Sequence, residues 1–176
     1  MIDYFITNLR NDIIILNLGG NRMRLENKVA VVTGASSGVG REIALLFAKE
    51  GAKVVISARR LPQLEEVAEK IRANGGEVLV VQADVSKAED AENLVTKTVE
   101  AFGKVDVLVN NAGVAGASPA EATPDEEWNY VVGVNLNSVY FVAREVGNVM
   151  LKNGYGKIIN IGSLHSEVVM PNTCWP

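Results

Sequence analysis

The sequence predicts an α/β protein in which five parallel strands form a doubly wound sheet with helices on both faces. Short runs rich in Val and Ile alternate with segments whose apolar residues recur at three- and four-residue spacing. The runs are almost continuously apolar, which is typical of strands buried on both faces. Alternating strands and helices imply right-handed crossovers between parallel strands, so a ligand is expected at the carboxyl ends of the strands.

The expected elements follow one another from Val29 onward. Strands are predicted over Val29–Thr33, Lys53–Ala58, Glu77–Gln82, Val105–Asn110 and Lys157–Ile161. Apolar residues at helical spacing lie between them, over Val39–Phe47, Leu61–Ile71 and Ala91–Phe102. The longest helical pattern extends from about Glu126 to Lys152, with a break near Gly133.

Composition places these elements in one globular domain, residues 25–176, in a chain of 176 residues of which 48% are hydrophobic. Residues 1–24 are expected to be a flexible extension, because their apolar run Ile13–Leu16 is too short for a signal peptide or a membrane span. The net charge of −4 is spread without a basic block, which disfavours nucleic acid as a partner. The single cysteine, Cys174, favours a reducing, cytoplasmic location, and with one histidine, His165, no protein-held metal site is expected.

The first strand leads directly into a glycine-rich loop, TGASSGVG, and then into a helix. Its three glycines allow positive φ angles and let a phosphate approach backbone amides at the helix N-terminus. A tight turn without a ligand is the alternative, but the strand–turn–helix context favours a dinucleotide phosphate. The candidate cofactor-binding residues here are Gly34, Ser36, Ser37, Gly38, Val39 and Gly40.

The end of the second strand indicates which dinucleotide is bound. An acidic residue at this place would hold the ribose 2′-hydroxyl of NAD, but the sequence has Arg59 and Arg60 instead. A guanidinium matches a 2′-phosphate in charge and in bidentate geometry, so Arg59 is predicted to favour NADP(H). Two solvated arginines at the start of a helix are the alternative.

Further motifs follow the third, fourth and fifth strands in order: Ala83-Asp84-Val85, Asn110-Asn111-Ala112-Gly113 and Gly162-Ser163. Together with the glycine loop, they resemble the short-chain dehydrogenase/reductase family, most of all the branch of 3-oxoacyl carrier-protein reductases. The resemblance extends from about Leu25 to Thr173. It implies a Rossmann domain that binds NADP(H) and an oxidoreductase acting on a small carbonyl or hydroxyl substrate.

For the cofactor, the resemblance implies that Asp84 contacts the adenine amino group and that Val85 packs beside the ring. Asn111, Ala112 and Gly113 would line the ribose and support the central strand. Simpler interpretations remain for each of them. Asp84 can cap the helix that follows, and the NNAG run can be an ordinary turn at the end of a strand.

For catalysis, the resemblance implies that Ser163 hydrogen-bonds the substrate carbonyl and that Asn135 helps to hold a water of the proton relay. Asn135 can instead face solvent from its helix, and Ser163 can simply end the fifth strand. The family also uses a Tyr-x-x-x-Lys pair as its acid and base, about thirteen residues after the serine. That position is Pro176, so the pair is not in the sequence.

Other residues are poor substitutes for this pair. Tyr155 and Lys157 precede the fifth strand, roughly 20 Å from Ser163 at 3.3 Å per strand residue. Tyr140 lies about 140° around its helix from Asn135 and should face elsewhere. His165 titrates in a useful range, but nothing in the sequence places it against a substrate.

The sequence departs abruptly from the family pattern at its final residues, CWP, as a frameshift or an early stop would produce. The domain is therefore expected to be truncated after strand five, with that strand as an exposed edge. The predicted function is an NADP(H)-dependent oxidoreductase that is weak or inactive as this chain. A non-catalytic NADP-binding or strand-pairing module is the alternative, and an oligomer could form through the helix after strand four or through the strand-five edge.

Overall fold

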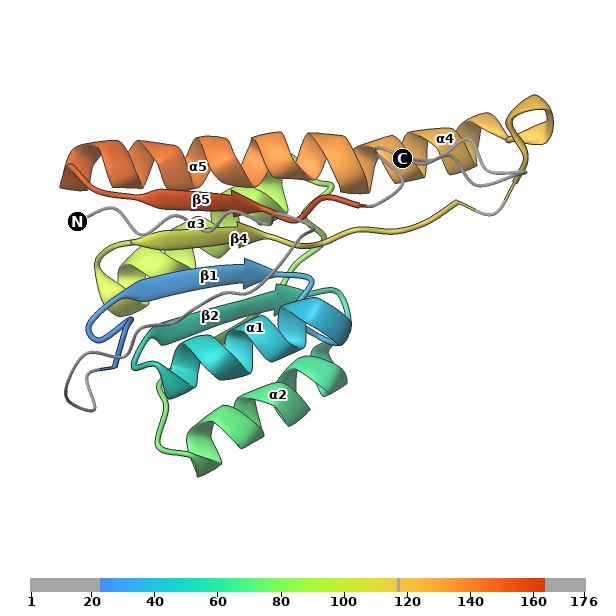
Figure 1. Ribbon diagram of the computed structural model, residues 1–176. Helices are drawn as coiled ribbons and strands as arrows, with labels where there is room; N and C mark the ends of the chain where they lie inside the picture. Colours follow the sequence, from blue (N-terminus) through green and yellow to red (C-terminus); the bar gives the residue numbers. More distant parts are fainter. Residues whose placement is uncertain (1–22, 117, 164–176) are drawn as a thin grey trace, which may run out of the picture.

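The sheet has five parallel strands in the order β3-β2-β1-β4-β5, which confirms the predicted fold class (Figure 1). The structure is a computed structural model that describes residues 23–116 and 118–163. Its strands are β1 (Val29–Thr33), β2 (Lys53–Ala58), β3 (Val78–Gln82), β4 (Val107–Asn110) and β5 (Lys157–Asn160). The strand order reverses between β1 and β4, and ligands of doubly wound sheets bind at the carboxyl side of such a switch point.

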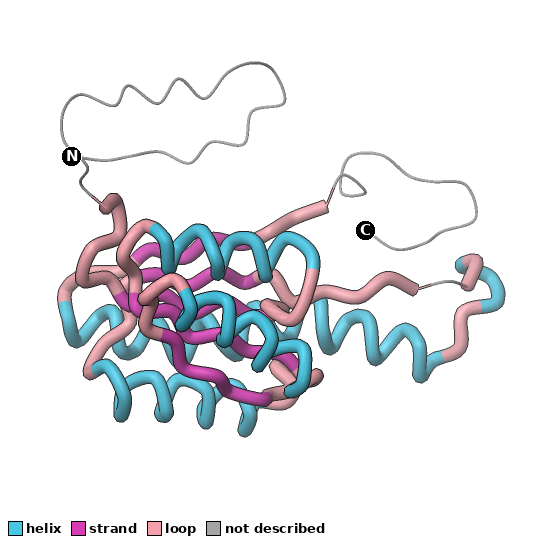
Figure 2. Tube along the Cα trace, turned by 90° about the horizontal axis from the view of Figure 1, so that it is seen from below, coloured by secondary structure: helices cyan, strands magenta, loops and turns pink. Residues whose placement is uncertain are grey.

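Helices cover both faces of the sheet, as Figures 1 and 2 show from two directions. One layer contains α1 (Gly38–Lys49) and α2 (Leu61–Ala73), and the other contains α3 (Ala88–Phe102) and α5 (Ser138–Asn153). A 3₁₀ turn (Ala120–Ala122) and α4 (Asp125–Val132) connect β4 with α5. None of the described helices is both long and apolar enough to cross a membrane.

The hydrophobic core consists of two clusters, one on each side of the sheet. Successive strand residues point to opposite faces, so neighbouring residues of one strand enter different clusters. Val32 and Ile56 pack with Leu64 in the α1–α2 layer, whereas Val31 and Leu108 pack in the α3–α5 layer. The core therefore depends on strand register, because a shift of one residue would exchange the two faces.

A buried carboxylate fixes the start of β4. The strand begins two residues later than the sequence pattern predicts, although Val105 and Asp106 are both buried. The Asp106 Oδ2 atom accepts a hydrogen bond from the Val29 backbone N–H at 2.8 Å and lies 2.8 Å from Lys104 Nζ. These partners offset the cost of burying the charge, and they tie β4 to β1.

The long helix predicted after strand four is present, and its break is a π-helical turn over Gly133–Asn137 between α4 and α5. A π turn inserts one extra residue into the helix and is often found at functional sites. In both views, α4 and the segment after β4 project beyond the carboxyl ends of the strands (Figures 1 and 2). This projection places α4 beside the region where the strand order predicts a ligand.

Candidate cofactor site

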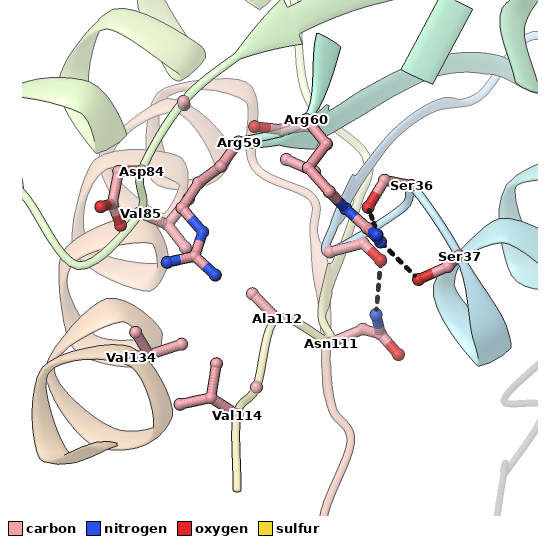
Figure 3. A pocket seen from close by; sticks show the side chains of 15 residues that line it. Ser36, Ser37, Arg59, Arg60, Asp84, Val85, Asn111, Ala112, Val114 and Val134 are labelled. Carbon is pink, nitrogen blue, oxygen red and sulfur yellow. Dashed lines mark hydrogen bonds between the residues drawn. The ribbon is translucent and has the colours of Figure 1, made fainter. Parts of the chain in front are cut away.

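A pocket of about 300 Å³ lies at the carboxyl ends of β1 to β4 (Figure 3). Its walls come from the glycine loop, the end of β2, the segments after β3 and β4, and the π-helical turn. Nine of the twelve predicted cofactor residues line it: Gly34, Ser36, Ser37, Arg59, Asp84, Val85, Asn111, Ala112 and Gly113. The other three, Gly38, Val39 and Gly40, form the first turn of α1 next to the pocket and do not line it.

The glycine loop needs its glycines for two different reasons. Gly34 and Gly38 have φ angles of +66° and +56°, in the left-handed region that favours glycine. Gly40 is required by a close approach, because a Cβ there would lie 2.6 Å from the Gly34 carbonyl oxygen and would overlap the Asn111 amide. The second requirement keeps the first turn of α1 in contact with the end of β1.

Thr33 and Asn111 attach the glycine loop to the end of β4. The Thr33 hydroxyl accepts hydrogen bonds from the backbone N–H groups of Asn111 and Ala112, at 3.0 and 3.1 Å. The Asn111 amide donates in return to the carbonyl oxygens of Thr33 and Gly34, at 3.0 and 3.3 Å. Although Asn111 lines the pocket, its side-chain N–H groups bond the backbone of the glycine loop, so they hold this loop against the end of β4.

Arg60, which the sequence analysis named only as a neighbour of Arg59, forms the closest link to the loop. Its Nη2 donates to the hydroxyls of Ser36 and Ser37, at 3.1 and 2.9 Å (Figure 3). Ser37 is the N-cap residue of α1, yet its side chain makes no cap hydrogen bond. The guanidinium and the N-terminal amides of α1 therefore lie at the same side of the pocket, and both favour an anion.

Arg59 points in a different direction. Its side chain extends into the pocket, where Nη1 donates to the hydroxyl of Tyr130 on α4 at 2.6 Å (Figure 3 shows the arginine). The guanidinium carbon lies 5.5 Å from the centroid of the same ring. The two adjacent arginines thus point in different directions: Arg60 contacts the glycine loop, and Arg59 contacts Tyr130 on α4, which lies beside the pocket.

Asp84 and Val85 lie on the wall opposite the loop (Figure 3). Asp84 Oδ1 accepts hydrogen bonds from the backbone N–H and the hydroxyl of Ser86, at 3.2 and 2.7 Å. Asp84 therefore closes a turn before α3. It is not the helix cap that the simpler interpretation expected, because α3 begins at Ala88 and its N-cap residue is Lys87. The Asp84 carboxylate also lines the pocket, so this turn is compatible with the predicted contact to a nucleotide base.

Neither predicted catalytic residue lines the pocket. Both polar groups of the Asn135 side chain bond the Val114 backbone: Oδ1 accepts from its N–H and Nδ2 donates to its carbonyl, each at 2.9 Å. Ser163 is exposed and follows the end of β5. Tyr140 is 62% exposed on α5, and His165 and Pro176 lie outside the described residues.

The pocket suits a polar ligand, as one buried atom indicates. Ser57 Oγ is fully buried, lines the pocket, and has no hydrogen-bond partner among the described residues. Buried hydroxyls normally have a partner, so this atom is available for a ligand group or a water. Together with the anion-favouring loop side and the apolar side chains of Val85 and Val134, the residues present fit a nucleotide.

Five residues of the pocket region carried no prediction: Ser57, Ala58, Val114 and Val134, which line it, and Tyr130, which lies beside it. Ser57 and Ala58 are inside an apolar strand, where a serine two residues before an arginine pair was the available signal. Val114, Tyr130 and Val134 lie on the segment after β4, on α4 and on the π turn, and tertiary packing brings them to the pocket.

Comparison with known proteins identifies the family. A family model described as short chain dehydrogenase matches residues 28–175. An uncharacterized oxidoreductase of Thermotoga maritima is 44% identical over 149 residues, which are 85% of this chain and 58% of that protein. A metagenomic short-chain oxidoreductase, solved in complex with NADP, is 37% identical with a TM-score of 0.81, over 85% of this chain and 68% of that one.

A second solved structure has similar values. An actinorhodin polyketide ketoreductase variant with NADPH is 39% identical with a TM-score of 0.80, over 83% of this chain and 57% of that one. The chain spans 55% to 60% of the length of the curated relatives compared. The family model matches most of the sequence and the fold agrees with it, so the chain belongs to the short-chain dehydrogenase/reductase family.

Proposed function

We propose that this chain binds NADP(H) in the pocket and forms the cofactor-binding part of an oxidoreductase that interconverts carbonyl and hydroxyl groups. Bound NADP(H) would supply the hydride chemistry. The chain's own residues would bind and orient it: the first turn of α1 at the phosphates, Arg60 at the 2′-phosphate, and Asp84 at the base. Two solved relatives, one with NADP and one with NADPH, support the same cofactor.

The observation that carries the preference for NADP(H) is the placement of Arg60. Its guanidinium is held 2.9 Å from Ser37 Oγ and 3.1 Å from Ser36 Oγ, on the side of the pocket where α1 begins. A planar guanidinium fixed by two hydroxyls loses little further freedom when it binds a phosphate. Arg59, the residue that the sequence favoured, would add a second positive charge once its side chain leaves Tyr130.

Only two of the residues expected to take part in catalysis, Ser163 and Asn135, are present in the sequence. Ser163 would orient a substrate carbonyl at the carboxyl end of β5, and Asn135 would act through the Val114 backbone that it holds. No Tyr-x-x-x-Lys sequence follows Ser163 in the 176 residues. These 176 residues alone therefore supply no such acid and base, and we expect them to bind the cofactor with little or no turnover.

The test is a fluorescence titration of the purified chain with NADPH and with NADH. We expect NADPH to bind at least about tenfold more tightly, since hydrogen bonds to charged groups contribute about 1.5–3 kcal/mol. Arg60→Ala should remove most of that preference and leave NADH binding unchanged. Equal affinities for the two nucleotides, or no saturable binding, would overturn the proposal.

Arg72→Ala is the matched control for Arg60→Ala. Arg72 is an exposed arginine on α2 whose partner is Glu65, 3.3 Å away, and it does not line the pocket. Its removal lowers the net charge by the same amount, so a general electrostatic effect would appear in both variants. A carbonyl-reduction assay on the same samples tests turnover. Robust NADPH-dependent reduction would contradict the expectation that these residues alone turn over little or no substrate.

A strand-pairing module is the second candidate function, and β5 favours it. This strand lies at the edge of the sheet and pairs only with β4 among the described strands. Ile158 is 43% exposed there, and an exposed apolar edge can pair with another chain. Light scattering after size exclusion should then show association that Ile158→Lys abolishes, whereas a monomer at every concentration would exclude this candidate.

A further inference from the structure

The Arg59 guanidinium lies inside the cofactor pocket and not in the solvent around it. Figure 3 shows it between Asp84 and Val85 on one side and Val134 and Ala112 on the other, all of which line the pocket. Val85 and Val134 are 7% and 6% exposed. A flat ligand group that enters between these apolar side chains must first displace the guanidinium.

A single polar contact holds the Arg59 side chain there among the described residues. Nη1 donates to the Tyr130 hydroxyl at 2.6 Å, and the guanidinium carbon is 5.5 Å from the ring centroid. The other hydrogen bond at this residue, from Gln82 Nε2 at 2.8 Å, goes to the Arg59 backbone oxygen and fixes the main chain. The backbone is therefore anchored while the side chain can move.

The contact connects two parts of the molecule that surround the pocket. Arg59 follows β2, and Tyr130 lies on α4, one helical turn before the pocket residue Val134. Tyr130 itself does not line the pocket and is 42% exposed. Its hydroxyl is uncharged, so the hydrogen bond is weaker than an ion pair and can be exchanged for a ligand.

We propose that Tyr130 is a latch that holds the Arg59 guanidinium in the part of the pocket that receives the nucleotide base, and that NADP(H) binds by releasing it. The inference rests on the proposed function, because it assumes a nucleotide in this pocket. A closed population lowers the apparent affinity by the fraction of molecules that are open. The latch thus reduces affinity for every nucleotide that uses the base site, with or without a 2′-phosphate.

The test compares Tyr130→Phe and Tyr130→Ala with the unmodified chain, by stopped-flow and equilibrium titration with NADPH and NADH. Phe removes only the hydroxyl, and Ala removes the ring as well. We expect affinity for both nucleotides to rise by about three- to tenfold in Tyr130→Phe and at least as much in Tyr130→Ala, mainly through faster association. Unchanged or weaker binding of both nucleotides in both variants would overturn the latch.

Tyr140→Phe is the matched control. Tyr140 is an exposed tyrosine on α5 whose ring also lies 5.5 Å from an arginine, Arg144, away from the pocket. Its substitution should leave both affinities unchanged. If Tyr140→Phe tightened binding as much as Tyr130→Phe, the effect would not belong to the latch.

A second readout needs no nucleotide and separates the latch from the proposed function. The Nε–Hε resonance of Arg59 in a ¹⁵N spectrum of the free chain, assigned with Arg59→Lys, reports whether the side chain is held. We expect Tyr130→Phe to shift this resonance and to leave that of Arg60 in place. A shift without any nucleotide binding would support the Tyr130 contact but defeat the proposed function, whereas no shift would defeat the latch alone.

Discussion

β1 and β5 are strands of one parallel sheet, yet one is enclosed and the other is open. All five residues of β1 are buried, whereas three of the four residues of β5 are exposed. β1 has a strand on each side and helix layers on both faces, while β5 has β4 on one side only among the described elements. Burial therefore depends on the neighbours of a strand more than on its own apolar sequence.

The same contrast separates the predicted cofactor residues from the predicted catalytic ones. The pocket lies beside β1, where hydrogen bonds join Arg60, after β2, to the glycine loop and Asn111, after β4, to Thr33. Ser163 lies after β5 and is exposed. A binding site can be preformed where neighbouring elements hold its side chains in place, as they do around β1.

The largest expected difference between the two regions is in the free energy of unfolding. Ile56 on β2 is fully buried, and Ile158 on β5 is 43% exposed. Ile56→Ala should cost about 2–5 kcal/mol, because it removes a buried side chain and leaves a cavity. Ile158→Ala should cost less than about 1 kcal/mol, since much of its area already faces water. Urea unfolding followed by circular dichroism measures both, and equal losses would mean that β5 is enclosed in solution.

The sequence was sufficient to predict the structure of those regions in which the local pattern and the burial agree. The strands, the glycine loop and the switch-point pocket followed from apolar runs and from the residues at the strand ends. It did not distinguish the directions of Arg59 and Arg60, which are adjacent. Those directions depend on Ser36 and Ser37, more than twenty residues away in the sequence, and on Tyr130, which is farther still.

The boundaries of helices and strands also include features that the local sequence did not predict. β4 begins two residues later than its apolar run predicts, although Asp106 still bonds Val29 through both its backbone N–H and its carboxylate. The break near Gly133 was visible as a glycine in a helical pattern, but its π-helical form was not. That form accompanies the paired hydrogen bonds between Asn135 and the Val114 backbone, a contact that spans 21 residues.

A second test adds one methyl group at Gly40, beside the end of β1, and one at Gly147, on α5. In Gly40→Ala the new Cβ would meet the Gly34 carbonyl oxygen at 2.6 Å, and backbone there cannot easily move. We expect the free energy of unfolding to fall by about 3 kcal/mol, which is at the upper end of the cost of overpacking. NADPH binding should be lost as well.

Gly147→Ala is the control for this substitution, because a Cβ at this position of α5 would meet no atom of the described residues within 4 Å. It should stabilise the chain by up to about 1 kcal/mol, as alanine favours helices over glycine. Thermal unfolding and NADPH titration of the two variants measure the difference. If Gly40→Ala were as stable and bound as well as Gly147→Ala, the close contact between α1 and the end of β1 would not be needed.

The smallest expected effect concerns the hydrogen bonds that join the glycine loop to β4. Thr33→Val keeps the shape of the side chain but removes the hydroxyl that accepts from the Asn111 and Ala112 N–H groups. Because the Asn111 and Ala112 N–H groups that lose their acceptor are only partly buried, we expect the free energy of unfolding to fall by about 1–2 kcal/mol. If the pocket binds NADPH as proposed, its affinity should fall by more than the loss of stability explains, since the glycine loop loses its attachment to β4.

Thr98→Val provides the comparison. Thr98 is fully buried, but its hydroxyl donates to the Leu94 carbonyl within α3, where the helix already supplies a hydrogen bond. Its replacement should change the free energy of unfolding by less than about 0.5 kcal/mol and should leave NADPH binding intact. If the two substitutions lowered stability and NADPH affinity equally, any buried hydroxyl would matter in the same way. A loss of NADPH affinity in Thr33→Val alone would show that the contact between β1 and the end of β4 shapes the pocket.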